Sequence, residues 1–151
     1  MFKIETAKAH CDVPCGIYDP LVAQIAALSV IRMVDLMEGL EKSDSLNYVN
    51  SISRHIATKE EEAEKVKHEV RIIWGDFIKG PQVEAYPEIH GLVHNIMMLG
   101  SANKQHVSKA KALELLDAVN RFAEIFWEIK GVTTKKMKAN YLPNEEIIVP
   151  A

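Results

Sequence analysis

The sequence predicts an all-α fold, an up-down four-helix bundle with a short hook before its first helix and an irregular tail after its last. Four stretches repeat apolar residues at spacings of three and four, which is the helical period. Short segments of turn residues separate them, and no stretch alternates apolar and polar residues convincingly as a strand would. The chain has 151 residues and 48% hydrophobic content, enough to fill one core in one domain.

The first helix is expected to begin at Asp19-Pro20 and to end near Glu41. Asp is a favoured N-cap residue because its carboxylate accepts from the free N–H groups of the first turn, and Pro is preorganised for the first helical position. One stripe, with a single polar member at Ser29, is expected to face the core: Val22, Ile25, Ser29, Met33, Leu36 and Leu40.

The second helix is expected to be long, from the capping segment Ser43-Asp44-Ser45 to the breaker Gly80-Pro81. Its stripe has one polar member, Lys59, among Val49, Ile52, Ile56, Ala63, Val66, Val70, Ile73 and Phe77. The opposite side carries a run of Glu and Lys between residues 60 and 69. Such a run could line an acidic site, but Glu and Lys are rarely buried, so a solvated face is the preferred interpretation.

Two further helices complete the bundle. The third is expected from Pro87 to near Gly100, with its inward residues at Ile89, Leu92, Val93, Ile96 and Met97. The fourth is expected from the cap residue Ser108 to Lys130-Gly131, with Ala112, Leu115, Val119, Phe122, Phe126 and Ile129 inward. Residues 132–151 show no sustained period and are expected to form a tail that packs on the domain or on a neighbouring subunit.

Composition excludes several classes of function. The formal net charge of −3 provides no basic field for a nucleic acid. No apolar run approaches the roughly 18 residues of a membrane span. The two cysteines lie close together in the chain and are too few for a disulfide framework, so reduced thiols in the cytoplasm are expected.

The first nine residues, Met1 to Ala9, lack the roughly 7–15-residue apolar region of a secretory signal. Small residues at Ala7 and Ala9 precede His10, as they often do at processing sites, and cleavage there would make His10 the new N-terminus. The predicted organisation is therefore a removable leader (1–9), a hook plus four-helix bundle (10–131) and a tail (132–151).

Both cysteines lie beside a histidine in the segment His10-Cys11-Asp12-Val13-Pro14-Cys15-Gly16. Pro fixes φ and Gly tolerates a positive φ, which favours a tight hook. The imidazole and two thiols of this segment are ligands for zinc, copper, nickel or iron. The simpler alternative is a buried histidine with two inert thiols, but the compact grouping favours a metal-binding hook.

Cleavage after Ala9 would add backbone nitrogens to these donors. The α-amine of His10 and the deprotonated amide of Cys11 would join the thiolates of Cys11 and Cys15 in a planar set, with the imidazole axial. Such a set suits Ni(II), or the related Cu(II), better than tetrahedral zinc. Anionic donors stabilise the higher oxidation state, so one-electron redox chemistry would follow, whereas zinc would give a structural clip.

The pattern H-C-D-x-P-C-G-x-Y-D-P after a short leader resembles the nickel-containing superoxide dismutases. Similar blocks extend the resemblance over roughly residues 10–130: Ile73-Trp74-Gly75-Asp76, Lys79, Tyr86-Pro87-Glu88-Ile89-His90, Leu92-Val93 and Ile125-Phe126-Trp127-Glu128. The resemblance implies a cytoplasmic homohexamer of four-helix-bundle subunits that acts on superoxide. It also implies a nickel ion that cycles between Ni(III) and Ni(II), and a protease that removes the leader.

The resemblance also implies roles for individual residues. His10 would supply the amine and the axial imidazole, Cys11 its amide and thiolate, and Cys15 the second thiolate. Tyr18 would lie over the substrate pocket, and Lys79 would lie near the entrance, where its charge could steer the superoxide anion. From the residues alone, Tyr18 could equally anchor the loop, and Lys79 could be a solvated cation at a helix end.

The chain departs from the family at three positions. Ala26 stands where the family usually has Glu, Glu62 where it has Arg, and Phe77 where it has Tyr. The first two positions form the pair that orients the axial imidazole in the family. Such partners affect metal affinity and activity. Two other hypotheses therefore stay open: an unprocessed relative that binds a metal or acts through its thiols, and a purely structural helical oligomer.

Overall fold

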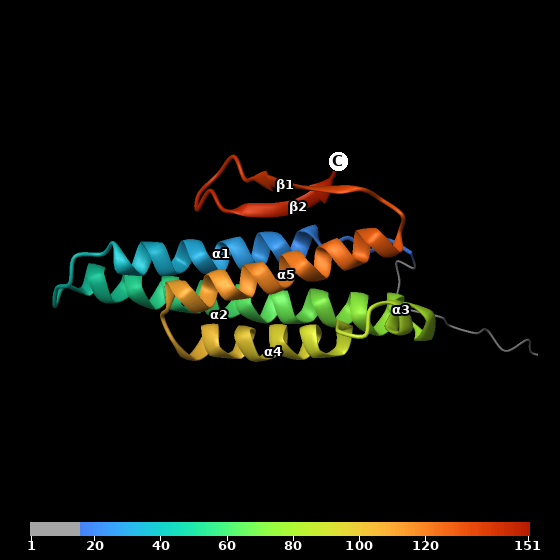
Figure 1. Cartoon of the computed structure of the whole chain (residues 1–151). Helices are drawn as coiled ribbons and strands as arrows, with labels where there is room; N and C mark the ends of the chain where they lie inside the picture. The colour runs from blue at the N-terminus through green and yellow to red at the C-terminus, as the bar shows by residue number, and fades with distance from the viewer. Residues whose placement is uncertain (1–15) are drawn as a thin grey trace, which may run out of the picture.

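A computed structural model describes residues 16–151, so the leader and the predicted ligands His10, Cys11 and Cys15 lie outside the described residues. Four helices run side by side along the molecule: α1 (Leu21–Glu38), α2 (Leu46–Ile72), α4 (Ile89–Gln105) and α5 (Lys109–Ile129) (Figure 1). Helix α1 packs against α2 and α5, and α4 packs against the same two helices. The predicted four-helix bundle is confirmed.

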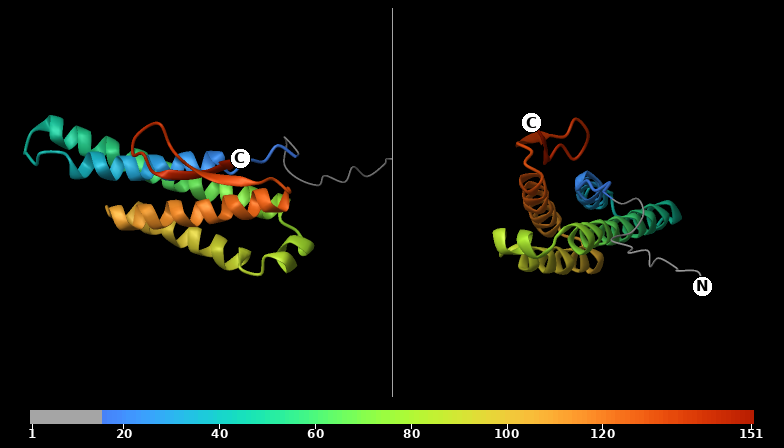
Figure 2. Two further views of the ribbon diagram at one scale, coloured as in Figure 1. Left: turned by 45° about the horizontal axis from the view of Figure 1, so that its top comes forward. Right: turned by 90° about the vertical axis from the view of Figure 1, so that its right-hand side faces the viewer.

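The core lies between these four helices, which Figure 2 shows from the side and from one end. Its fully or almost fully buried side chains include Val30, Ile31, Val34, Ala63, Val66, Val70, Ile89, Val93, Ile96, Leu115, Val119, Phe122 and Phe126. Burial of each large apolar side chain contributes about 1.5–3 kcal/mol to folding. None of the helices among residues 16–151 is long and apolar enough to cross a membrane.

Helix α1 turns a different face to the core from the one that its sequence pattern predicts. The buried face carries Ala23, Ala27, Val30, Val34 and Met37, whereas Val22 and Ile25 from the predicted stripe are 39% and 40% exposed. Both stripes have helical spacing, because α1 carries apolar residues on most of its circumference. Periodicity alone therefore could not choose between them.

Helix α4 continues past Gly100, where the sequence predicts its end, and stops at Gln105. Gly100 is buried against α2, and a Cβ built on it would lie 2.8 Å from Cγ of Lys67. The glycine therefore marks a close approach of two helices rather than a helix end.

Lys59, the polar member of the predicted α2 stripe, lies inside the molecule with 1% of its surface exposed. Its ammonium donates to the carbonyl oxygens of Asn103, Lys104 and His106 at the C-terminal end of α4. The last carbonyls of a helix lack partners within the helix, and a cation near them is also favoured by the helix dipole. Lys59 thus caps α4 from a neighbouring helix, and burial lowers the pKa of its ammonium from the usual 10.5.

The C-terminal end of α2 widens into a π-helix, η1 (Ile73–Phe77), in which Ile78 N donates to Ile73 O over 3.3 Å. A short helix, α3 (Gly80–Ala85), occupies part of the segment predicted to be a simple connection. These two elements close one end of the bundle (Figure 1).

The tail, expected to be irregular, forms an antiparallel hairpin of β1 (Thr134–Lys138) and β2 (Glu146–Pro150). β2 packs on α5 and α1 (Figure 2), and the side chains of Ile147 and Ile148 are almost fully buried. Strand β1 reads Thr-Lys-Lys-Met-Lys, and all but its first residue are exposed. Because apolar and polar residues do not alternate in β1, its sequence does not clearly indicate a strand.

A buried polar contact connects this hairpin to the bundle, so Asn120→Ala should loosen it. Gln24 Nε2 donates to Asn120 Oδ1 over 2.8 Å, and Asn120 Nδ2 donates to the carbonyl oxygen of Glu146 over 2.8 Å. Removing the Asn120 amide leaves buried polar groups unpaired, so stability should fall by about 1–3 kcal/mol. Hydrogen exchange of the β2 amides should accelerate, whereas Asn95→Ala at an exposed position of α4 should change neither quantity. Unchanged β2 exchange in the Asn120 variant would contradict this role.

Candidate functional site

Four aromatic rings meet at the end of the bundle where the described chain begins, and we call them the aromatic cluster. Tyr18 precedes α1, Phe77 ends η1, and Phe126 and Trp127 lie near the end of α5. Ring centroids are 6.1 Å apart for Tyr18 and Phe77, 5.0 Å for Phe77 and Phe126, and 5.0 Å for Phe126 and Trp127. Aromatic pairs attract at such separations, so the cluster connects the segment before α1 with η1 and α5.

Lys130 adds a positive charge to the aromatic cluster. Its Nζ lies 5.4 Å from the ring centroid of Phe77 and 5.5 Å from that of Phe126, within the range of a cation–π contact. The sequence offers one signal for this contact, because Lys130 follows Phe126 by four residues and both extend from the same side of α5. The sequence pattern predicts Lys130 only as the end of a helix.

Tyr18 is half-buried, and its hydroxyl oxygen is shielded from solvent. Its ring packs against Phe77, so the residue anchors the segment that leads from the hook into α1. This placement brings one of the two predicted catalytic residues into the aromatic cluster.

Lys79, the second predicted catalytic residue, lies two residues after Phe77 and is exposed. Its Nζ donates to the carbonyl oxygen of Gly75 over 3.0 Å, and its backbone N–H donates to Gln82 Oε1 over 3.0 Å. The ammonium therefore caps the end of η1.

The position of η1 is also fixed from α4. Trp74 Nε1 donates to His90 Nδ1 over 3.0 Å, and the two rings meet edge to face with centroids 5.7 Å apart. This contact holds the short π-helix that presents Phe77 to Tyr18.

Two positions that depart from the expected family pattern lie on different helices. Ala26 is fully buried in α1, and its methyl group cannot form a hydrogen bond. Glu62 is partly buried on α2, where its carboxylate lies 3.9 Å from Lys65 Nζ. Among residues 16–151, no group of three or more His, Cys, Asp or Glu side chains is placed to hold a metal ion.

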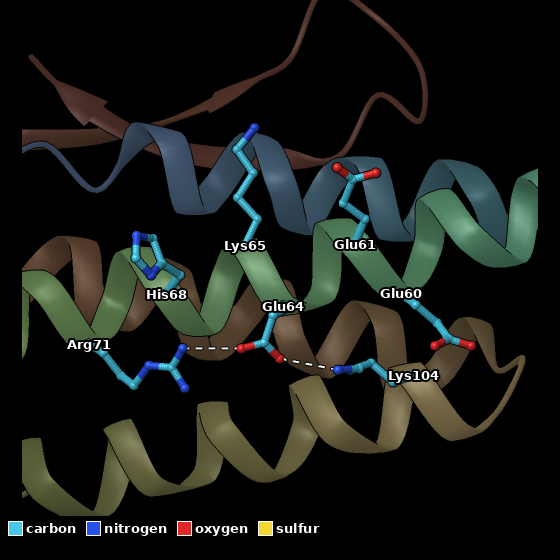
Figure 3. Close-up of a pocket in the computed structure, with 7 residues that line it drawn as sticks. All are labelled: Glu60, Glu61, Glu64, Lys65, His68, Arg71 and Lys104. Carbon is cyan, nitrogen blue, oxygen red and sulfur yellow. Dashed lines mark hydrogen bonds and ion pairs between the residues drawn. The ribbon is translucent and has the colours of Figure 1, made fainter.

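A wide groove of about 540 Å³ lies along the middle of α2 (Figure 3). None of its lining residues belongs to the aromatic cluster. Glu64 lies at its centre and pairs with Arg71 on the same helix at 3.1 Å and with Lys104 on α4 at 3.2 Å. Glu64 is thus paired with cations on both sides, and the charged side chains that line the groove are partly or fully exposed to solvent. The groove is therefore the charged, solvated face that the sequence predicts.

The hydrogen bonds that Glu64 accepts from Lys104 and Arg71 hold the pKa of its carboxyl below the usual 4.5. A group with a lowered pKa in the folded state stabilises the fold above its unfolded pKa and loses this contribution as the pH falls through the folded pKa. Glu64→Gln should therefore flatten the decline in stability below about pH 4.5. The effect should stay under about 1 kcal/mol because the side chains are partly exposed. Urea titrations at pH 7 and pH 3 would measure it, and an unchanged acid dependence would contradict it.

A sequence model of the family described as nickel-containing superoxide dismutase matches residues 5–130. The chain is 39% identical over 125 residues to the nickel superoxide dismutase of Streptomyces coelicolor, a match that covers 83% of this chain and 91% of the relative. It is 38% identical over 122 residues to that of Streptomyces seoulensis, covering 81% of this chain and 88% of the relative.

Solved structures agree with these matches. A native nickel superoxide dismutase superposes with a TM-score of 0.70 at 39% identity, covering 80% of this chain and 99% of the other. A nickel-containing superoxide dismutase with nickel ligation of the oxidised state gives a TM-score of 0.71 at 38% identity, covering 81% and 99%.

Proposed function

Because this chain belongs to the nickel-containing superoxide dismutase family, we propose that His10, Cys11 and Cys15 hold its nickel ion after removal of residues 1–9. The protein is a nickel-type superoxide dismutase, which converts superoxide into oxygen and hydrogen peroxide. This function is favoured over an unprocessed thiol protein and over a purely structural oligomer. The observation that carries it is the match over residues 5–130, which includes the hook as well as the bundle.

The donor chemistry of the hook fits nickel. Cys11 and Cys15 offer two soft thiolates, and His10 offers an imidazole. In the uncut chain the nitrogen of His10 belongs to a peptide bond, so its lone pair is delocalised into the carbonyl group of Ala9 and the nitrogen is a poor donor. Cleavage after Ala9 would turn it into an amine, and this amine, the amide of Cys11 and the two thiolates would then offer nickel two nitrogen and two sulfur donors.

Bound nickel supplies a one-electron Ni(III)/Ni(II) couple, by which one superoxide loses an electron to become oxygen and another gains one to become hydrogen peroxide. The second half of this exchange consumes two protons. Tyr18 is our candidate for holding a proton at its hydroxyl oxygen beside the substrate. The other members of the aromatic cluster, Phe77, Phe126 and Trp127, have no hydroxyl group. Tyr18 is therefore the member of the cluster that can hold a proton on oxygen.

Superoxide is an anion, and the chain as a whole has a net charge of −3, so local cations would guide it to the site. Lys79 was predicted for this role from the sequence, and Lys130 joins it as a candidate because its ammonium lies over the ring of Phe77. Lys130 is the better placed of the two, since Lys79 directs its ammonium to Gly75 O.

We further propose that the subunits assemble as a homohexamer in the cytoplasm and that a dedicated protease removes the leader. Assembly is supported by the exposed apolar side chains at the start of α1, where Leu21, Val22 and Ile25 are 38%, 39% and 40% exposed. Exposed apolar surface of this kind is typical of protein–protein contacts.

The proposal is tested by comparing three purified forms: the full chain, a chain that begins at His10, and a chain with one alanine before His10. Intact mass identifies each form, and metal analysis gives nickel per chain. The form beginning at His10 should bind about one nickel and accelerate superoxide decay, whereas the other two should do neither. Nickel binding by all three forms, or a trimmed form that refuses nickel, would refute the proposed ligand set.

A further inference from the structure

A small cavity of about 290 Å³ lies between α1 and the first half of α2, and we call it the seam cavity. The start of α1 at Leu21 and the cavity residue Met33 are about 18 Å apart along the helix axis, so the cavity lies well away from the aromatic cluster. Its lining residues are Met33 and Leu36 of α1 and Ser51, Arg54, His55 and Thr58 of α2.

The α2 wall of the seam cavity is polar and carries positive charge. Its four residues follow one another at spacings of three and four, so they lie on one face of the helix. A helix face that packs beside another helix is typically apolar, whereas this one presents two hydroxyls, an imidazole and a guanidinium. All four groups can donate hydrogen bonds, and no carboxylate lines the cavity within residues 16–151. Such a set of donors is suited to an anion.

These four side chains have no hydrogen bond or ion pair with the part of the chain that the structure describes. The contrast with Ser53 on the same turns of α2 is clear, because Ser53 Oγ donates to Val49 O over 2.8 Å. His55 Nδ1 is moreover shielded from solvent without a partner in the described range. Buried polar atoms nearly always have a hydrogen-bond partner, so an unpaired one indicates a bound water or ligand.

We propose that the seam cavity binds the phosphoryl group of a small phosphomonoester. The forked N–H groups of Arg54 pair with two phosphoryl oxygens, and the hydroxyls of Ser51 and Thr58 supply further donors. The partly buried side chains of Met33 and Leu36 contact the carbon part of the ligand. The cavity is at the lower end of the range for small-molecule sites, roughly 300–1,000 Å³, which limits this carbon part to a few atoms. Binding requires neither nickel nor removal of the leader.

Calorimetric titration and thermal unfolding of the full chain in phosphate-free buffer test the proposal. The probes are inorganic phosphate and glycerol 3-phosphate, with sodium chloride at matched ionic strength as the control. Both probes should bind with a dissociation constant of about 1 mM or lower and raise the thermal midpoint above its value in chloride. Glycerol 3-phosphate should bind more tightly because its carbon chain contacts the apolar wall, whereas tighter binding of inorganic phosphate would refute a phosphomonoester as the ligand. The absence of any binding beyond the chloride control would overturn the site.

Matched variants on α2 locate the binding. Arg54→Gln should weaken the affinity for glycerol 3-phosphate at least about tenfold, whereas Arg71→Gln, which removes the same charge outside the cavity, should leave it unchanged. Thr58→Val removes one hydroxyl and should weaken binding about threefold, and Ser53→Ala is its control. Circular dichroism would confirm that each variant is folded. Equal affinities for the Arg54 and Arg71 variants would overturn the proposal, because binding would then reflect overall charge rather than the seam cavity.

Discussion

Replacing either Cys11 or Cys15 with serine in the trimmed chain should abolish nickel binding and reduce superoxide decay to its spontaneous rate. A serine hydroxyl is not deprotonated near neutral pH and is a poor ligand for a soft site, so one anionic sulfur donor is lost. Even changes to groups that merely support ligands commonly cost 10- to 100-fold. Loss of a ligand should therefore reduce activity by more than about 100-fold.

The measurement is nickel per chain together with the catalysed rate of superoxide decay, both on material whose mass shows that it begins at His10. Met98→Ser removes a sulfur atom from an exposed position of α4 and serves as the control. The thermal midpoint of the cysteine variants should match that of the metal-free parent, because the described core is built from side chains between Ala23 and Ile148. Full activity in either cysteine variant would show that the replaced cysteine is not a nickel ligand.

Replacing Lys59 with methionine should destabilise the fold by about 2–4 kcal/mol. Methionine retains most of the apolar stem, but three carbonyl oxygens at the end of α4 lose their common donor. A buried acceptor without a partner costs about 1–3 kcal/mol, and the effects on adjacent carbonyls are not fully additive. The loss of local stability should be concentrated at the C-terminal end of α4 and in the turn into α5.

Denaturant unfolding would give the free energy of unfolding, and hydrogen exchange would locate the change. Lys65→Met, at a side chain that is 46% exposed on the same helix, provides the matched control and should shift stability by less than about 0.5 kcal/mol. Equal stabilities for the two variants would show that Lys59 does not cap α4.

Much of the architecture could be predicted from periodicity and cap residues. Ser45 accepts from Tyr48 N over 3.1 Å at the start of α2, and Ser108 accepts from Lys111 N over 3.4 Å at the start of α5, as their positions before apolar repeats indicated. These are local signals, since a cap and its helix lie within a few residues of each other. The stripe of α5 was likewise predicted because only one side of that helix is apolar.

The features that were missed depend on contacts between distant segments. The inward face of α1 is chosen by α2 and α5, and the end of α4 is set by Lys59 on another helix. The hairpin is held by Asn120, which contacts Glu146 across 26 positions of sequence. The spacing of Lys130 and Phe126 in the sequence indicates only weakly that Lys130 lies over the aromatic cluster. Its contact with Phe77 depends on the packing of η1 beside α5.

The sequence by itself determined the four long helices and, through the pattern H-C-D-x-P-C-G-x-Y-D-P, the nickel-dependent family, because both depend on residues that are neighbours in the chain. Only the tertiary structure decided which face of α1 is buried, how Tyr18, Phe77 and Lys130 come together, and where the hairpin lies. These features depend on which of several apolar surfaces is buried in the one core. The sequence pattern of a single element does not show this, because burial is decided only when the elements pack together.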